Sequence, residues 1–320
     1  MANRTRIVLF AAVVLAVVGG TGTYLAVNRP APAPVADKPT ALADGPHLLF
    51  RDTTTKTLAR VALDGAPDRK HERTDVLCDR VHSIGTQTLC AHVVGLRLTN
   101  EMYDDKLVPV WATDGEGVPS RTRIAPDGRM AATTVFVAGD SYNQTDFSTR
   151  TTLVDPASGD SIADLEQLTT YDRASAEVTA ADRNYWGVTF AGGDVFYAAV
   201  KYAGEMHIVR GDLATRTMRI IADGGGCPSV SPDGTRVVFK TPAGLSIVDV
   251  ASGVVRALPE TREFDEQVVW LDDSTVLYSV PREKAADVWR LPVDGGAAAL
   301  YLSDASSPSV VRSSTERQSP

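Results

Sequence analysis

The sequence predicts an all-β fold, a six-bladed β-propeller, preceded by one N-terminal apolar segment. After residue 45, short runs rich in β-branched and aromatic residues follow one another, separated by Gly, Asp and Pro turns. These turns recur at intervals close to 40 residues, about the length of a four-stranded propeller blade. The last strand-like run also resembles the first strand of a blade, and such a strand is missing at the start of the series.

The N-terminal segment is long enough to cross a membrane. Arg4 and Arg6 precede Ile7–Val27, a stretch of 21 uncharged residues that would extend about 31 Å as a helix. We expect residues 1–28 to form a transmembrane signal-anchor; the alternative is a cleaved signal peptide with Ile7–Val18 as its apolar region. The two arginines hold the N-terminus inside, which makes the rest of the chain extracytoplasmic. The protein is thus expected to be a single-pass protein of the cell membrane, or to be secreted if the segment is cleaved.

Residues 29–45 form a linker rich in proline and alanine, which predicts a semi-extended tether. The chain has 32 basic and 40 acidic residues. Four of the basic and two of the acidic residues precede residue 46, so the part expected to be exported has 28 basic and 38 acidic residues and a net charge of −10. An acidic surface of this kind argues against a nucleic-acid partner. The composition, 43% hydrophobic and 22% charged, is that of a folded protein.

Two interleaved series of turns define the blades. The first contains Gly85, Asp127, Asp194, Asp233 and Asp273, at intervals of 42, 67, 39 and 40 residues. The second contains Asp64, Asp114, Asp155, Asp212, Asp249 and Asp294, at intervals of 50, 41, 57, 37 and 45 residues. We therefore expect one propeller over residues 46–311, followed by a disordered tail over residues 312–320.

The two ends of the propeller are complementary. Pro46–Phe50 opens directly on what should be the second strand of a blade, whereas Ser307–Val311 resembles Cys227–Val230, the beginning of a blade. We expect the C-terminal strand to close the ring beside His47–Arg73. Such closure would leave no open sheet edge between the first and last blades.

One repeat unit carries a resemblance to a known family. Ser231–Phe239 reads Ser-Pro-Asp-Gly-Thr-Arg-Val-Val-Phe, and Arg123–Gly128 repeats its turn. This unit resembles the WD40-like (PD40) repeat of TolB-type six-bladed propellers, and Ser141–Arg150, Asn184–Phe190 and Glu266–Asp273 resemble exported actinobacterial TolB-like proteins. The resemblance implies the fold and suggests a role in envelope assembly or transport. Because TolB's partner motifs are not recognisable here, we do not assign that role to this chain.

The alternation of strand direction assigns each turn to one of two faces. Turns from the first to the second strand and from the third to the fourth share what we call the first face. Connections from the second to the third strand and between blades share the second face. Long polar loops on a rigid scaffold are typical of binding sites. On the second face we expect the long connections Gly95–Lys106, Gly139–Ser148, Tyr171–Tyr185, Lys201–Glu205, Pro259–Glu266 and Pro281–Ala286.

Within that face, two loops carry candidate ligand-binding residues. They are Tyr142, Asn143, Asp146, Phe147, Arg150, Arg183 and Trp186. Their aromatic rings and donors would suit an anion or a carbohydrate. Alternatively, Trp186 is core between blades and the arginines brace neighbouring loops.

Metal binding and catalysis find little support in the sequence. The carboxylates Asp104, Asp105, Asp140, Asp146, Asp272 and Asp273 lack EF-hand spacing, and aspartate is a common turn residue. No catalytic motif is recognisable, so we expect neither a cofactor nor an enzyme. The sequence favours a binding and scaffolding module for an envelope protein, peptide or glycan. The alternative is a propeller hydrolase or lyase with carboxylates in the central funnel.

The three cysteines divide into a pair and a single residue. Cys78 and Cys90 are placed on consecutive strands of one hairpin, and an oxidising exterior would favour a disulfide between them. Cys227, on an inner strand, is expected to be a small buried apolar residue.

Overall fold

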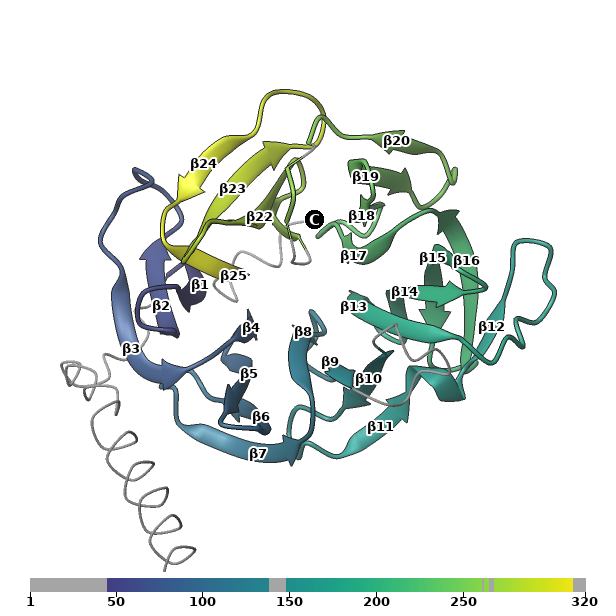
Figure 1. Cartoon of the computed structure of the whole chain (residues 1–320), viewed down its shortest axis with the longest axis horizontal. Coiled ribbons are helices and arrows are strands. Elements are labelled where there is room, and N and C mark those ends of the chain that lie inside the picture. The colour runs from purple at the N-terminus through teal and green to yellow at the C-terminus, as the bar shows by residue number, and fades with distance from the viewer. Residues whose placement is uncertain (1–44, 138–147, 261, 265–267, 313–320) are drawn as a thin grey trace, which may run out of the picture. The chain divides into compact units, whose positions relative to one another are not determined.

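The protein is an all-β, six-bladed propeller. The computed structural model describes residues 45–137, 148–260, 262–264 and 268–312. Six sheets are arranged around a central axis, with the first strand of each sheet nearest the centre (Figure 1). The described residues contain one short helix, the 3-10 turn η1 (Leu165–Gln167). The fold class predicted from the spacing of the turns is therefore confirmed.

The first three blades each have four antiparallel strands. From the centre outward, blade 1 contains β25 (Ala305–Val311), β1 (His47–Asp52), β2 (Thr57–Ala62) and β3 (Glu72–Leu77). Blade 2 contains β4 (Arg80–Ile84), β5 (Gln87–Val94), β6 (Arg97–Tyr103) and β7 (Pro109–Gly115). Blade 3 contains β8 (Val118–Ile124), β9 (Ala131–Val137), β10 (Ser148–Val154) and β11 (Ser161–Asp164).

The remaining blades follow the same order, with one addition. Blade 4 contains β13 (Asn184–Gly192), β14 (Val195–Tyr202), β15 (Glu205–Asp212) and β16 (Thr217–Asp223), and β12 (Thr169–Tyr171) adds a parallel strand outside β16. Blade 5 contains β17 (Gly226–Val230), β18 (Arg236–Thr241), β19 (Gly244–Asp249) and β20 (Val255–Ala257). Blade 6 contains β21 (Val269–Asp272), β22 (Thr275–Pro281), β23 (Ala286–Pro292) and β24 (Ala299–Leu302).

The last strand of the chain closes the ring. β25 pairs antiparallel with β1, so that Val311 lies opposite His47 and Ser309 lies opposite Leu49. The C-terminal strand thus supplies the innermost strand that blade 1 lacks at its N-terminal end. The predicted closure is observed.

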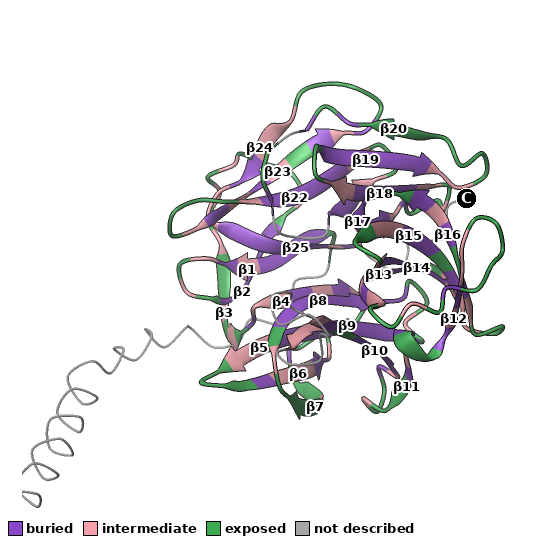
Figure 2. Ribbon diagram, turned by 45° about the vertical axis from the view of Figure 1, so that its right-hand side comes forward, coloured by how far each residue is buried: buried purple, intermediate pink, exposed green. Residues whose placement is uncertain are grey.

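The core consists of apolar layers between neighbouring blades. Successive side chains of a strand point to opposite faces of the sheet. On β1, Leu48 and Phe50 therefore pack against blade 6, while Leu49 packs against blade 2. Figure 2 shows that burial is concentrated on the inner and middle strands, while outer strands such as β7 and β20 are largely exposed. Each blade is thus stabilised mainly by its two neighbours, which makes closure of the ring important for stability.

Two of the predicted long connections are wrong, because the structure has strands and a two-residue turn in each of them. β6 occupies most of Gly95–Lys106, and a two-residue turn of Gly95 and Leu96 joins it to β5. Gly95 has φ +67°, which a glycine tolerates well in a tight hairpin. In the same way, only Ala203 and Gly204 separate β14 from β15 within Lys201–Glu205. Both segments looked like loops because their strand residues are polar.

The second series of turns contains a misassigned aspartate. Asp114 lies inside β7, opposite Thr99. The turn between the third and fourth strands of blade 2 instead begins at Asp104, whose Oδ1 accepts hydrogen bonds from the backbone N–H groups of Lys106 (2.9 Å) and Val108 (2.8 Å). An aspartate that caps its own turn in this way is a common local motif, and two candidates ten residues apart were not distinguishable by spacing alone.

The predicted disulfide is present, but one of its two cysteines lies outside the hairpin on which it was predicted. Cys78 and Cys90 are bonded, with their Cα atoms 5.6 Å apart. Cys78 lies in the connection from β3 to β4 and not on a strand of the hairpin, where Val81 is the residue opposite Cys90. The bond therefore ties the crossing from blade 1 to blade 2 to the second strand of blade 2.

The predicted N-terminal anchor, the linker and most of the tail lie outside the described residues. Within the part of the chain that is described, no helix is long and apolar enough to span a bilayer.

Candidate functional site

A cavity of about 1000 Å³ lies at the centre of the ring and opens on the first face. All six blades contribute to its wall, each with the end of its innermost strand. Its wall is mostly apolar, its mouth is acidic and two arginines lie within it. The apolar lining includes Ile84, Ile124, Phe190, Val230, Val269 and Val310. The cavity is formed by residues that are far apart in the sequence and that meet only because the ring closes.

The mouth of the cavity is formed by the tight turns between first and second strands. In the turn Ser231–Gly234, the N–H of Gly234 donates to the carbonyl of Ser231 (2.9 Å), and Oδ1 of Asp233 accepts from the N–H of Thr235 (3.0 Å). Pro232 at the second position and Gly234 at the fourth are the residues that a type I turn prefers. The turn at Asp127 in blade 3 repeats this arrangement, and both aspartates face the cavity.

Hydrogen bonds join the turns of neighbouring blades around the mouth. The backbone N–H of Asp233 donates to Oδ1 of Asp273 in the next blade, at 3.2 Å. Arg236 strengthens the same junction, because its guanidinium donates to the backbone oxygen of Asp273 and to Oδ1 of Asp294. These contacts hold the rim in place between blades 5 and 6, as a binding surface requires.

The cavity also carries basic and neutral groups. Arg123 is 7% exposed and donates from Nη2 to the backbone oxygen of Val268 at 2.9 Å. Arg312 donates to the backbone oxygen of Leu271. Burial, with the positive charge of Arg123, holds the pKa of His82 well below its ordinary value. His82 is therefore neutral, and its Nδ1 accepts a hydrogen bond from the N–H of Ile124 (3.1 Å).

The aspartates at the mouth are ionised acceptors. Burial by itself would raise the pKa of Asp127, but hydrogen bonds from Arg129 and Gly193 outweigh it and lower the pKa. The pKa of Asp233 is lowered in the same way, against the effect of burial, by hydrogen bonds from Ser231 and Thr235. A glycosidase needs one carboxylic acid with a raised pKa to protonate the leaving group. These two aspartates do not have that property.

The structure describes three of the seven residues predicted to bind a ligand. Tyr142, Asn143, Asp146 and Phe147 lie outside the described residues. Arg150 lies on β10 and Arg183 immediately precedes β13, with Nη1 of Arg183 donating to the backbone oxygen of Ala180 at 2.7 Å.

The side-chain amide of Asn184 accepts hydrogen bonds from the N–H (2.9 Å) and hydroxyl (2.6 Å) of Thr149, so the segments that carry Arg150 and Arg183 lie side by side. Trp186, in contrast, packs toward blade 5: a Cβ added to Gly226 would lie 3.1 Å from its ring. None of Arg150, Arg183 and Trp186 lines the central cavity.

The described residues do not contain a cluster of three or more His, Cys, Asp or Glu side chains that could hold a metal ion. Of the carboxylates considered from the sequence, Asp104 and Asp272 accept hydrogen bonds within their own turns. Asp140 and Asp146 lie outside the described residues.

The innermost strands could have indicated the cavity from the sequence. His82 and Arg123 line the cavity from the innermost strands β4 and β8, which should be apolar if they faced only neighbouring blades. Polar residues at such positions are a sign that the strand lines a central space. The predicted long loops were assigned to the second face, whereas the large cavity opens on the first.

Six closed blades around a cavity lined by strand ends define a six-bladed β-propeller with a preformed central site. No protein-family model and no curated protein matches the chain. Among solved structures, TolB from Acinetobacter baumannii superposes with a TM-score of 0.56 at 14% identity, over 85% of this chain and 67% of that chain.

A chain of a nidogen/laminin complex gives a TM-score of 0.59 at 11% identity, over 83% of this chain and 98% of that one. A puromycin-hydrolyzing peptidase of Mycobacterium tuberculosis gives 0.50 at 15% identity, over 83% of this chain and 45% of the peptidase. Identities this low establish the fold and not the activity. The protein has the TolB-like propeller fold.

Proposed function

We propose that this protein is an extracytoplasmic, membrane-tethered binding module that uses the central cavity of its propeller to hold a protein segment, a peptide or a glycan of the cell envelope. The observation that supports this proposal is the cavity of about 1000 Å³, with its hydrogen-bonded acidic mouth and apolar wall. Cavities of this size and polarity are typical of ligand sites. The likeness to TolB and to a chain of a protein–protein complex agrees with a binding role.

The chemistry of the mouth supports a non-catalytic role. Asp127 and Asp233 are turn acceptors with lowered pKa values, and His82 is a neutral hydrogen-bond acceptor. These groups are suited to contact backbone N–H groups or cationic side chains of a ligand. The propeller hydrolase or lyase would instead need a carboxylic acid that stays protonated near neutral pH.

Photo-crosslinking tests this proposal with two exposed turns on opposite faces of one blade. Thr86 follows Gly85 at the mouth of the cavity, whereas Leu96 is 96% exposed on the second face. A photoreactive residue at position 86 of the full chain in cells should give a discrete crosslinked product, and one at position 96 should not. Equal products from both positions, or none from position 86, would contradict binding at the cavity.

The proposed topology needs a separate experiment. Protease added to intact spheroplasts should remove the propeller domain from their surface. Complete protection, with a cytoplasmic control protein also intact, would contradict an extracytoplasmic domain whether or not the cavity binds a ligand.

A further inference from the structure

A second, smaller cleft lies on the second face, between blades 6 and 1. Its volume is about 290 Å³. The turn between β1 and β2 forms one wall, the turn between β22 and β23 forms another, and the beginnings of β25 and β4 form the floor. The cleft is lined by five basic residues, Arg51, Lys56, Arg80, Arg282 and Lys284, and by no acidic residue. This composition is unusual for a chain with a net charge of −8.

Carboxylates outside the cleft neutralise only part of this charge. Arg282 contacts Asp287 at 2.8 Å and Asp304 at 2.6 Å, and Arg51 lies 3.4 Å from Asp79. Within the described part of the chain, the ammonium groups of Lys56 and Lys284 form no ion pair. A positive charge therefore remains at the opening of the cleft, because both lysines are exposed.

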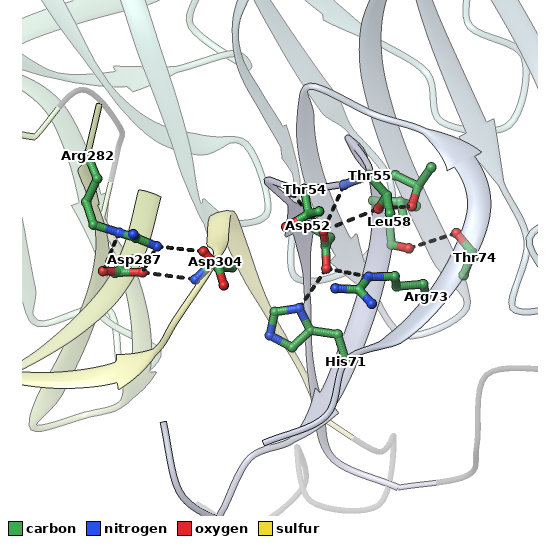
Figure 3. Close-up of polar contacts among 11 residues, drawn as sticks. Asp52, Thr54, Thr55, Leu58, His71, Arg73, Thr74, Arg282, Asp287 and Asp304 are labelled. Atoms are coloured by element: carbon green, nitrogen blue, oxygen red, sulfur yellow. Dashed lines mark hydrogen bonds and ion pairs between the residues drawn. The ribbon is translucent and has the colours of Figure 1, made fainter. Parts of the chain in front are cut away.

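The turn of blade 1 is held rigidly by the buried carboxylate of Asp52. Its Oδ1 accepts from the backbone N–H groups of Thr54 (2.9 Å) and Thr55 (3.0 Å), and the N–H of Lys56 donates to the Asp52 backbone oxygen (2.8 Å). Figure 3 shows the Asp52 carboxylate with Thr54 and Thr55, together with Arg73, which also donates to Asp52. The turn thus presents Lys56 from a fixed backbone.

The turn of blade 6 is held in a comparable way. Asp287 accepts from the backbone N–H of Asp304 (2.9 Å), and the guanidinium of Arg282 bridges the two aspartates (Figure 3). The backbone N–H of Thr53 donates to the backbone oxygen of Asp304 at 3.0 Å. Asp304 lies between β24 and β25 and thus links the turn of blade 1 to Arg282 in the turn of blade 6. Both basic walls of the cleft are therefore preorganised relative to each other.

One buried polar atom at the cleft has unused hydrogen-bonding capacity. Oγ1 of Thr53 is buried without a hydrogen-bond partner among the described residues, whereas Nε of Arg51 faces Asp79. Buried polar groups are usually satisfied, so such an atom often marks the place of a missing ligand or water. The hydroxyl of Thr53 is able to donate, which matches an acceptor-rich ligand.

We propose that this cleft binds a tetrahedral oxyanion, namely a phosphoryl or sulfate group. Basic side chains approach it from two turns and from β4, and tetrahedral anions present oxygens in several directions, whereas a carboxylate presents two in one plane. Arginine and lysine together are well suited to such groups. The site lies on the face opposite the central cavity and does not depend on what that cavity binds.

Calorimetry on the purified full chain tests the proposal, with inorganic phosphate, sulfate and acetate as probes at matched ionic strength. We expect saturable binding of phosphate or sulfate with a stoichiometry of one, and weaker binding of acetate. The double substitution Lys56→Ala/Lys284→Ala should weaken binding about tenfold, since each exposed charge contact contributes up to about 1 kcal/mol. Lys56→Arg/Lys284→Arg should retain binding.

The matched control is Lys70→Ala/Lys106→Ala, which removes the same charge from two exposed lysines outside the cleft. It should bind phosphate like the unmodified protein, and all variants should keep the same melting temperature. Equal weakening by both alanine pairs, or binding of acetate as tight as that of phosphate, would overturn the proposal. Glucose 6-phosphate and a short-chain phosphatidylglycerol in detergent then distinguish a soluble phosphate ester from a lipid headgroup as the natural source.

Discussion

His71 donates a hydrogen bond from Nδ1 to the buried carboxylate of Asp52 at 2.7 Å, joining two residues that are 19 positions apart (Figure 3). Asp52 is completely buried and ends β1, whereas His71 directly precedes β3. Arg73 adds a second donor at 2.8 Å. One carboxylate therefore connects the second and fourth strands of blade 1 and also holds the turn that forms one wall of the basic cleft.

Replacing this carboxylate should destabilise the propeller. We expect Asp52→Asn to lower the free energy of unfolding by about 3 kcal/mol, because it leaves the donors of His71 and Arg73 without their anionic acceptor. Urea unfolding of the two proteins measures the difference. Asp68→Asn, at an exposed turn residue, is the control and should change stability by less than about 0.5 kcal/mol. A neutral effect of Asp52→Asn would show that the network contributes nothing to stability.

The contribution of Asp52 should depend on pH in one direction. Burial opposes ionisation of Asp52, but hydrogen bonds from His71, Thr55 and Arg73 outweigh it and hold the pKa far below its ordinary value. Because the pKa of Asp52 is lower in the folded protein than in the unfolded chain, its ionised carboxylate stabilises the fold. This stabilisation is fully present above the unfolded-state pKa of about 3.9 and is lost as the pH falls below that value. The stability difference between the protein and Asp52→Asn should therefore be constant from pH 7 to 5 and shrink from pH 4 to 3. A difference that grows on acidification would contradict this sign.

The disulfide should stabilise the junction of blades 1 and 2. Cys78 and Cys90 are 12 residues apart, and closing a loop of that length in the unfolded chain contributes about 2–3 kcal/mol. We expect Cys78→Ser/Cys90→Ser to lower the unfolding free energy by that amount. Dithiothreitol should destabilise the unmodified protein similarly and leave the double variant unchanged; if the reductant destabilises both equally, the effect does not come from this bond.

Closure by β25 should be required for folding. Deleting Ser307–Pro320 removes most of the strand that pairs with β1, including Ser309, which is completely buried. We expect loss of the cooperative thermal transition and a larger hydrodynamic radius. A chain that ends at Arg312 keeps β25 and is the control. An unchanged melting temperature of the longer deletion would refute the importance of closure.

Much of the architecture was predictable because it depends on local chemistry. The turn Ser231–Gly234 recurs as Ala125–Gly128 in blade 3, and Asp, Pro and Gly occupy such turns for conformational reasons that act within four residues. One turn was assigned to the wrong residue: Asp114 was predicted to begin the turn that Asp104 begins in the structure. Both aspartates lie at intervals from the neighbouring turns that fit the length of a blade. The disulfide between Cys78 and Cys90 was predicted by placing both cysteines on one hairpin of a chain that is expected to be exported.

The two candidate sites were not predictable in the same way. Asp127, Asp233 and Asp273 each read as ordinary turn residues, and nothing local indicates that they surround one cavity. Lys56 and Lys284 are likewise single basic residues on opposite ends of the chain. Their neighbours in space belong to other blades, and only closure of the ring brings them together.

By itself, the sequence determined the all-β class, the number of blades and the joining of the two ends, because strand alternation and turn chemistry operate over a few residues and repeat. The tertiary structure decided where a ligand could bind. A central cavity and an inter-blade cleft are formed by side chains contributed from several blades, and their size, charge and accessibility depend on the angles at which the closed ring holds those blades.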